Sequence, residues 1–264
     1  MDTPAHHRPY AGPVPSGAPA AAVVHAIHDR YLYEIVEDLG VCPFARRCRQ
    51  LGRLHRLPFV ADRDGPTPDA VARHLGALLD DHDDAEIVLL TFVPVRDHRF
   101  WDPGAFEDFT RAVRAAYEAR RTHARGLPRL YAVSFHPDPP KPAHRPTPEN
   151  LVPTLRRTPD PVIQCVRADM LDALRAESSR SARARLEREM ARIDPALAAR
   201  LRHAILTDPA LSSEIAERNF AAVGAGPARQ ALEDRLARFF EERRRAYPAA
   251  FAPPAPPAQT PAAL

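Results

Sequence analysis

The fold is decided by residues 86–93, which read EIVLLTFV. This run is apolar at nearly every position and has the length of a single strand. A strand with one solvated face alternates apolar and polar side chains, whereas a strand covered on both faces does not. The run is therefore predicted to form a central strand of a sheet.

Further extended runs lie before and after it, separated by segments with helical periodicity. Residues 130–135 (LYAVSF) are typical of a second buried strand and residues 161–166 (PVIQCV) of a last strand. Residues 54–60 are typical of an edge strand, because Pro58 cannot donate a ladder hydrogen bond. Strands that alternate with helices favour an α/β fold, with α+β as the alternative. We expect a single sheet of about four strands covered by helices, with a C-terminal helical extension.

Proline and alanine mark the ends of this core. Residues 1–20 and 248–264 are rich in both and are predicted to be disordered tails. The α/β domain is expected over residues 22–225, with an arginine-rich helical insertion at 178–210. A last amphipathic helix is expected over residues 226–247.

The overall charge and hydropathy exclude several classes of partner. The net charge is +3, because 34 acidic residues offset 36 arginines and a single lysine, Lys141. An arginine excess of this kind is typical of GC-rich codon usage, and without a long basic run nucleic acid is not an expected partner. No stretch approaches the roughly 18 consecutive apolar residues that span a membrane, and no apolar signal core is present near residue 1. We expect a soluble cytoplasmic protein that does not contact a membrane.

Cysteine usage argues against structural cross-links. The chain has three cysteines, Cys42, Cys48 and Cys165, and an odd number without a secretory signal does not indicate a disulfide framework. The spacing of Cys42 and Cys48 matches none of the common zinc motifs. No metal site is predicted, and no glycine-rich phosphate loop points to a particular cofactor.

The first candidate catalytic residue is Cys42, within the stretch VCPFARR at residues 41–47. An amphipathic helix is predicted over residues 22–39, with Gly40 as its stop. If a second helix begins at Cys42, the helix dipole and the two following arginines favour the thiolate, which is the nucleophilic form. The alternative is a buried cysteine that serves as a small hydrophobic residue.

The second candidate is His136, in the stretch Ser134-Phe135-His136-Pro137. It directly follows a predicted strand, and open α/β sheets bind ligands at the carboxyl ends of their strands. His136 could therefore accept a proton from Cys42 or from a substrate. The alternative is a structural histidine that hydrogen-bonds a neighbouring loop.

The third candidate is the proline-bracketed turn at residues 156–161, RRTPDP. Rigid prolines would hold Arg157 in place, and a fixed guanidinium is a fork for a carboxylate or a phosphate. Arg167 lies just beyond this turn. The alternative, in which the arginine pairs with the protein's own carboxylates or carbonyls, is favoured for Arg156 and equally weighted for Arg157.

In this order and spacing, the motifs resemble those of a bacterial family catalogued as Domain of Unknown Function 1415. The resemblance spans roughly residues 22–225 and rests on Cys42-Pro43-Phe44-Ala45, Ser134-Phe135-His136-Pro137, Arg157-Thr158-Pro159 with Pro161, Arg167, and Ile215 with Arg218-Asn219. It implies that Ser134 and Asn219 belong to the same site. Two positions depart from the family pattern, since Arg156 and Gln164 stand where the family has Asn and His.

Two kinds of function are compatible with these motifs. In the first, the protein is a small cytosolic enzyme with Cys42 and His136 as catalytic residues. Its anionic small-molecule substrate would be bound by Arg157 and Arg167, with Ser134 and Asn219 beside them. In the second, the protein is a non-catalytic ligand-binding or protein-interaction module, and Cys42 and His136 are structural. The sequence predicts neither a cofactor nor an oligomeric state.

Overall fold

The structure is a computed structural model of the chain. It describes residues 6–123, 126–139, 147–173, 175–176, 180, 184, 188, 192 and 210–254. Most of the predicted insertion at 178–210, together with residues 1–5 and 255–264 of the predicted tails, lies outside the described residues.

One mixed sheet forms the centre of the molecule, which confirms the predicted fold class. Its strands lie in the order β1 (His6–His7), β2 (Leu54–Ala61), β3 (Ile87–Pro94), β5 (Val162–Arg167) and β4 (Leu130–Phe135). Strand β3 lies in the middle, as the unbroken apolar run 86–93 predicts. A short β1 adds only two residues to four longer strands.

The last strand in the chain is not the last strand in the sheet. Strand β5 lies between β3 and β4 and is antiparallel to both. Strand β4, which the sequence predicts to be buried, is therefore the edge of the sheet, and its residues after Leu130 are only half-buried. The edge position corrects the expectation that His136 follows a buried strand.

Pro58 is accommodated on the outer side of β2. The carbonyl of Pro58 accepts a hydrogen bond from the backbone N–H of Ala11, on the side away from β3. In an extended strand the N and the carbonyl of one residue point to the same side. The missing N–H therefore faces the edge, and the β2–β3 ladder is intact.

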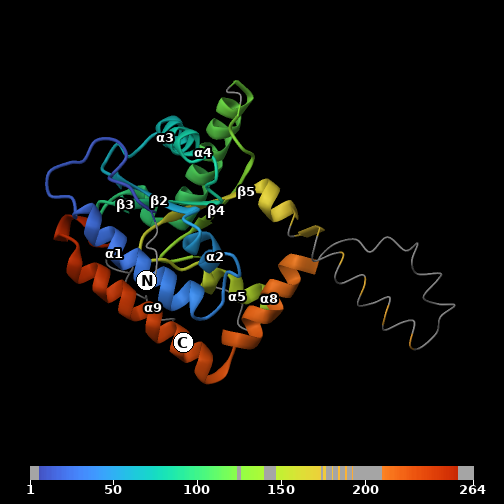
Figure 1. The fold of residues 1–264 in the computed structure, drawn as a ribbon. Coiled ribbons are helices and arrows are strands. Elements are labelled where there is room, and N and C mark those ends of the chain that lie inside the picture. Colours follow the sequence, from blue (N-terminus) through green and yellow to red (C-terminus); the bar gives the residue numbers. More distant parts are fainter. Residues whose placement is uncertain are drawn as a thin grey trace.

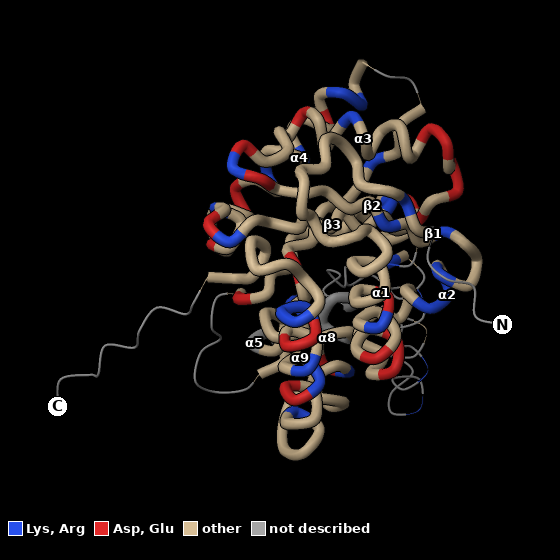
Figure 2. Tube along the Cα trace, turned by 90° about the vertical axis from the view of Figure 1, so that its left-hand side faces the viewer, with Lys and Arg blue, Asp and Glu red and all other residues tan. Residues whose placement is uncertain are grey.

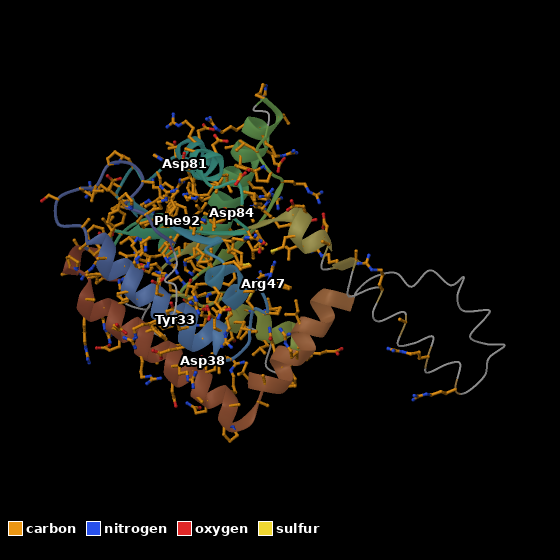
Figure 3. The ribbon with its side chains drawn as sticks, in the orientation of Figure 1. Tyr33, Asp38, Arg47, Asp81, Asp84 and Phe92 are labelled. Carbon is orange, nitrogen blue, oxygen red and sulfur yellow. The ribbon has the colours of Figure 1, made fainter. Side chains whose placement is uncertain are left out.

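Two helices cover one face of the sheet. They are α3 (Pro68–Asp81), which begins at the capping hydroxyl of Thr67, and α4 (Pro103–His123) (Figure 1). Between them and the sheet lies the largest apolar core, with Phe92 at its centre. Figure 3 labels Phe92 among the side chains beneath these helices. Its ring contacts four other phenylalanine rings: Phe59, Phe100, Phe106 and Phe109.

The opposite face carries helices from the early part of the chain, from its middle and from its C-terminal part. They are α1 (Ala21–Tyr31), the π-helical η1 (Leu32–Glu37), α2 (Ala45–Gln50), α5 (Pro148–Leu155), α8 (Ala210–Val223) and α9 (Gly226–Ala246). Helices α1 and α9 lie side by side in Figure 1 and contact each other. The helix predicted over residues 22–39 thus divides into α1 and η1. Gly40 follows with φ +64°, a left-handed conformation that favours glycine.

Parts of both predicted tails are ordered, contrary to the expectation of disorder. Residues His6–His7 form β1, and the Tyr10 hydroxyl donates to the carbonyl of Pro19 at 2.8 Å. At the other end, Phe251 is buried in an apolar cluster. Proline does not prevent this order, because a segment at a sheet edge or in a short turn needs few backbone donors.

A buried carboxylate joins the two ends of the chain to the sheet. Asp160, which directly precedes β5, is fully buried. It accepts hydrogen bonds from His28 Nε2 at 3.0 Å, Arg243 Nε at 2.7 Å and the Tyr247 hydroxyl at 2.8 Å. Arg243 and the hydrogen bond from His28 hold the pKa of Asp160 below its usual range. Helices α1 and α9 are thereby bound to the same carboxylate.

Acid is expected to destabilise the fold through its buried histidines, which include His25 and His98. Burial lowers the pKa of His25 and of His98 to about 4. Below pH ~6.5 the unfolded chain takes up protons that the folded chain refuses, so stability falls as the pH falls. Between pH 6.5 and 4, the loss reaches up to about 1.4 kcal/mol per pH unit for each histidine.

Urea unfolding at pH 7, 6 and 5 measures this loss directly. The variant His98→Asn should show a shallower loss of stability with falling pH than the parent. The variant His123→Gln, which changes an exposed histidine, should follow the parent. Equal unfolding free energies at pH 7 and pH 5 in the parent would contradict the prediction.

Candidate functional site

A cavity of about 360 Å³ lies on the face of the sheet that α1, α5 and α8 cover. Its walls are mainly aliphatic and aromatic side chains: Tyr31, Leu32, Val36, Val41, Phe44, Leu54, Ile87, Leu89, Phe135, Val152, Leu155, Val162 and Ile215. The polar groups on its wall come from His28, Cys42, Arg56, Arg156, Thr158, Gln164 and Asn219. A mostly apolar cavity with a few polar side chains is typical of a small-molecule site.

The floor of the cavity follows from the strand register. Arg56 lies opposite Leu89 in the β2–β3 pair, and Leu89 lies opposite Gln164 in the β3–β5 pair. Directly opposed residues project to the same face of a sheet. The two polar side chains therefore flank Leu89 on one row, with their backbones about 10 Å apart.

Cys42 lies in the short loop between η1 and α2 and reaches the cavity wall. The loop is tied back to η1, since the N–H of Val41 donates to the carbonyl of Val36 at 3.0 Å. Asn219 on α8 holds the same loop from the other side, because its amide Nδ2 donates to the carbonyl of Val41 at 3.1 Å. Asn219 thus lines the cavity, and its amide also positions the cysteine loop.

The surroundings of Cys42 differ from those the sequence predicts. Burial raises the pKa of its thiol, and hydrogen bonds from the N–H groups of Phe44 and Ala45 oppose this rise only in part. Arg46 and Arg47 add little positive charge, because Arg46 pairs with Glu37 at 3.5 Å and Arg47 with Glu86 at 3.3 Å. The expected thiolate is therefore replaced by a protonated thiol near neutral pH.

His136 is not brought to Cys42. Cys42 packs beside Leu54 and Ile87 at one end of the sheet. His136 follows the opposite end of β4, roughly 16 Å further along the strand direction. Its ring packs near Phe106, under α4, on the face that does not carry the cavity.

Both ring nitrogens of His136 already have partners. The backbone N–H of Asp138 donates to Nδ1 at 3.0 Å, so Nε2 carries the proton and donates to the carbonyl of Phe100 at 2.9 Å. Burial lowers the pKa of His136, which keeps the ring neutral. This geometry fits the structural alternative and leaves no nitrogen of His136 to accept a proton from Cys42.

Ser134 lies on the same face as His136, and its hydroxyl donates to Glu107 on α4. It precedes His136 by two residues, so strand alternation places both side chains away from the cavity. Ser134 is therefore separated from Cys42 and Asn219.

The two arginines predicted to bind an anion pair within the protein instead. Arg157 Nη1 donates to Glu233 on α9 at 2.8 Å. Arg167 donates to the carbonyl of Asp83 and lies 3.4 Å from the Asp169 carboxylate. Neither side chain lines the cavity. The rigid turn thus positions Arg157 for the protein's own carboxylate, which is the alternative the sequence left open.

Five polar residues of the cavity were not among the predicted site residues: His28, Arg56, Arg156, Thr158 and Gln164. One signal was present, since Arg56 is a charged residue inside the strand LHRLPFVA, at a position whose neighbours on the same face are apolar. Gln164 and Arg156 stand at the two positions where the chain departs from the family pattern. Their place on the cavity wall depends on the register of β5, which holds Gln164, and on helix α5, which Arg156 follows.

His28 also lines the cavity and has its carboxylate partner, Asp160, behind it. Burial lowers the pKa of His28, which favours the neutral ring. The structure thus places a neutral imidazole, a thiol and a buried guanidinium on the wall of one cavity. Across the described ranges, no group of three or more His, Cys, Asp or Glu is arranged to hold a metal ion.

In the part of the chain that the structure describes, no helix is both long and apolar enough to cross a membrane.

Comparison with known proteins finds no relative of this chain. The resemblance to the family of Domain of Unknown Function 1415 stays a prediction. No family model, curated protein or solved structure matches this chain.

Proposed function

We propose that this protein binds a small molecule in the cavity beneath Cys42. The observation that carries the proposal is the cavity itself, about 360 Å³ in volume and lined by residues that lie far apart in the chain. Polar groups on an otherwise apolar wall supply specific hydrogen bonds, whereas the apolar wall supplies most of the affinity. This cavity replaces, as the candidate site, the grouping of Cys42, His136 and Arg157 that the sequence motifs predict.

The charge distribution supports a small molecule over nucleic acid. Figure 2 shows acidic and basic positions interspersed along α3, α4 and α9. Many of these charges pair with one another, such as Arg30 with Glu242 at 2.7 Å and Arg121 with Glu118 at 2.8 Å. A nucleic-acid surface would instead need a row of unpaired basic side chains.

Thermal unfolding in the presence of small metabolites tests the proposal. A ligand present at a hundred times its dissociation constant stabilises the folded protein by about 2.7 kcal/mol, which raises the unfolding temperature by several degrees. The variant Ala216→Phe, on α8, places a large ring in the cavity and should abolish this rise. Its unfolding temperature without ligand should stay near that of the parent, because Ala216 is only half-buried.

A matched control uses the same substitution outside the cavity. Ala237→Phe adds the same ring to α9, at a position away from the cavity wall. It should retain the ligand-induced rise. If Ala216→Phe keeps the rise in full, or if no metabolite produces one, the ligand does not bind in this cavity.

A second candidate function is an enzyme that uses the Cys42 thiol. It is favoured by the position of the thiol on the cavity wall, where two backbone N–H groups donate to the sulfur. Because the thiol is protonated near neutral pH, such an enzyme would have to remove its proton after the substrate binds. This candidate predicts turnover that is lost in Cys42→Ser, whereas the binding function predicts that Cys42→Ser retains the ligand.

We also propose a cytoplasmic location. All three cysteines, Cys42, Cys48 and Cys165, are free thiols, and Cys48 and Cys165 are buried. Free thiols persist in the reducing cytoplasm, whereas oxidising compartments favour disulfides.

A further inference from the structure

Three arginines are buried among the residues that the structure describes, and one of them has no carboxylate within hydrogen-bond distance. Arg49, Arg56 and Arg243 are each 2–3 % exposed. A buried guanidinium has five N–H donors, and each donor left without an acceptor costs free energy. Comparing the three therefore shows which of them has donors to spare for a ligand.

Two of the three bind a carboxylate through both sides of the guanidinium. Arg49 donates from Nε at 2.8 Å and from Nη2 at 2.9 Å to Glu37. Arg243 has Nε and Nη2 each 2.7 Å from Asp160, and its Nη1 donates to the carbonyl of Phe251 at 2.9 Å. Each of these two arginines thus has a carboxylate at hydrogen-bond distance, although the geometry at Arg243 Nη2 does not make a hydrogen bond.

Arg56 is the exception, and it is the one of the three that lines the cavity. Its Nη1 donates to the Thr91 hydroxyl at a long 3.3 Å, and its Nη2 lies 3.6 Å from Asp29 Oδ1, beyond hydrogen-bond distance. Its Nε has no hydrogen-bond partner among the described residues. Burial lowers the pKa of Arg56, and Asp29 opposes this effect less strongly, so the positive charge is only partly compensated.

The carboxylates near Arg56 leave its guanidinium without a close acceptor. Asp160 already accepts hydrogen bonds from His28, Arg243 and Tyr247. One oxygen of Asp29, Oδ2, is 2.5 Å from His7 Nε2, whereas Oδ1 has no hydrogen-bond partner among the described residues and still lies 3.6 Å from Arg56 Nη2. Arg56 therefore keeps donor capacity for an acceptor in the cavity that it lines.

The rest of the cavity defines the body of the ligand. Most of the wall around Arg56 is hydrocarbon, and the floor beside it is the side chain of Leu89. Beyond Leu89 lies the half-buried Gln164, whose amide makes no hydrogen bond within the described ranges. A ligand that spans this floor would meet a charged group at one end, an apolar surface, and an amide at the other end.

We propose that the cavity binds a monoanionic carboxylic acid with a hydrocarbon body, whose carboxylate accepts hydrogen bonds from the Arg56 guanidinium. This inference rests on the proposed function and names its ligand class. A carboxylate matches the planar fork of arginine. A doubly charged phosphate fits less well, because the other arginine on the wall, Arg156, is exposed and the Asp29 carboxylate lies near Arg56. Gln164 is positioned to bond a second polar group on the ligand.

The test compares straight-chain acids from acetate to decanoate with the amides of the same acids, by calorimetric titration of the full chain. At least one acid is expected to bind at least about tenfold more tightly than its amide, because a hydrogen bond to a charged group is replaced by one to a neutral group. In Arg56→Met this ratio should fall to about one. The matched variant Arg157→Met changes an arginine outside the cavity and should leave the ratio unchanged.

Removal of the buried charge could disturb folding through Asp29. The double variant Arg56→Met/Asp29→Asn removes both partners of the loose ion pair and is the substitute if Arg56→Met does not fold. The comparison of acid with amide in the parent protein needs no variant and tests the inference by itself.

Each outcome bears on one of the two proposals. Equal affinity for acid and amide, with both abolished by Ala216→Phe, would overturn the carboxylate inference and support the cavity as the site. A preference for the acid that survives in the Arg56 variants would show that another cation binds it, which also overturns the inference. Absence of binding by every acid overturns the inference too. The proposed function is then decided by the metabolite screen.

Discussion

Replacing Asp160 by alanine is expected to lower the free energy of unfolding by about 3–5 kcal/mol, because Arg243 would remain buried without its carboxylate. The effect is large against a typical stability of about 5–15 kcal/mol. The same substitution removes the acceptor of His28 and of Tyr247. Because these donors come from α1 and from the end of α9, both helices should loosen together.

Chemical denaturation of the parent and of Asp160→Ala at pH 7 measures this loss. Asp160→Asn keeps the shape of the side chain and should also be strongly destabilised, which separates the missing charge from the missing volume. Asp38→Ala is a suitable control, because Asp38 is exposed and lies 4.0 Å from Arg46, an arrangement that contributes at most about 1 kcal/mol. A loss below about 1 kcal/mol in Asp160→Ala would show that the buried charges are not coupled in this way.

The contribution of Asp160 should depend on pH in a defined direction. Its pKa in the folded protein lies below the usual value. The stabilisation is therefore fully present above the pKa of an unfolded aspartate, ~3.9, and is lost as the pH falls through the lower folded pKa. The difference in stability between the parent and Asp160→Asn should accordingly shrink only in strong acid.

Alkylation of Cys42 by iodoacetamide is expected to be at least about tenfold slower in the folded protein at pH 7 than in the unfolded chain. Only the thiolate reacts, and each unit by which burial raises the pKa lowers the thiolate fraction tenfold. The rate should still rise with pH above pH 9. The variant His136→Ala should leave the whole profile unchanged, because His136 lies on the other face of the sheet.

The measurement needs a background in which Cys42 is the single reactive group. Burial raises the pKa of Cys48 and raises that of Cys165 to about 12, so a Cys48→Ala/Cys165→Ala chain removes both without adding a polar atom. A rate in the folded protein that exceeds that of a free thiol at pH 7 and falls in His136→Ala would restore the catalytic pair. A slow rate that a bound ligand slows further would support the cavity as the binding site.

The fold could be predicted where a local pattern has a single structural solution. The unbroken apolar run of β3 can be buried only inside a sheet, and Pro58 can be placed only where a strand lacks a neighbour along part of its length. The position of β5 could not be predicted in this way. Its six residues would fit an edge or the interior, and parallel or antiparallel pairing, since the choice depends on how far the chain before it travels.

The candidate site was predicted in part, since Cys42 and Asn219 lie on the cavity wall. His136, Ser134, Arg157 and Arg167 do not, because their chemistry was read without the face on which each side chain projects. Strand alternation predicts that the side chains of Ser134 and His136 project to one face and that of Phe135 to the other. The structure places the first two on the face that α4 covers and Phe135 in the cavity. Arg56 could not be identified from the sequence in this way. The argument for it as a site residue depends on the lack of a close carboxylate partner, which only the structure shows.

The insertion of β5 between β3 and β4 sets the order in which a newly made chain can acquire its structure. While the ribosome has released only the residues up to β4, that strand has no neighbour and β3 has an open edge, a surface on which foreign strands can pair. Synthesis must reach residue 167 before the sheet closes. It must continue to Arg243 before Asp160 is neutralised. Until these residues have emerged, the inner edge of β3 and then the Asp160 carboxylate lack their native partners, which leaves the incomplete chain open to misassembly.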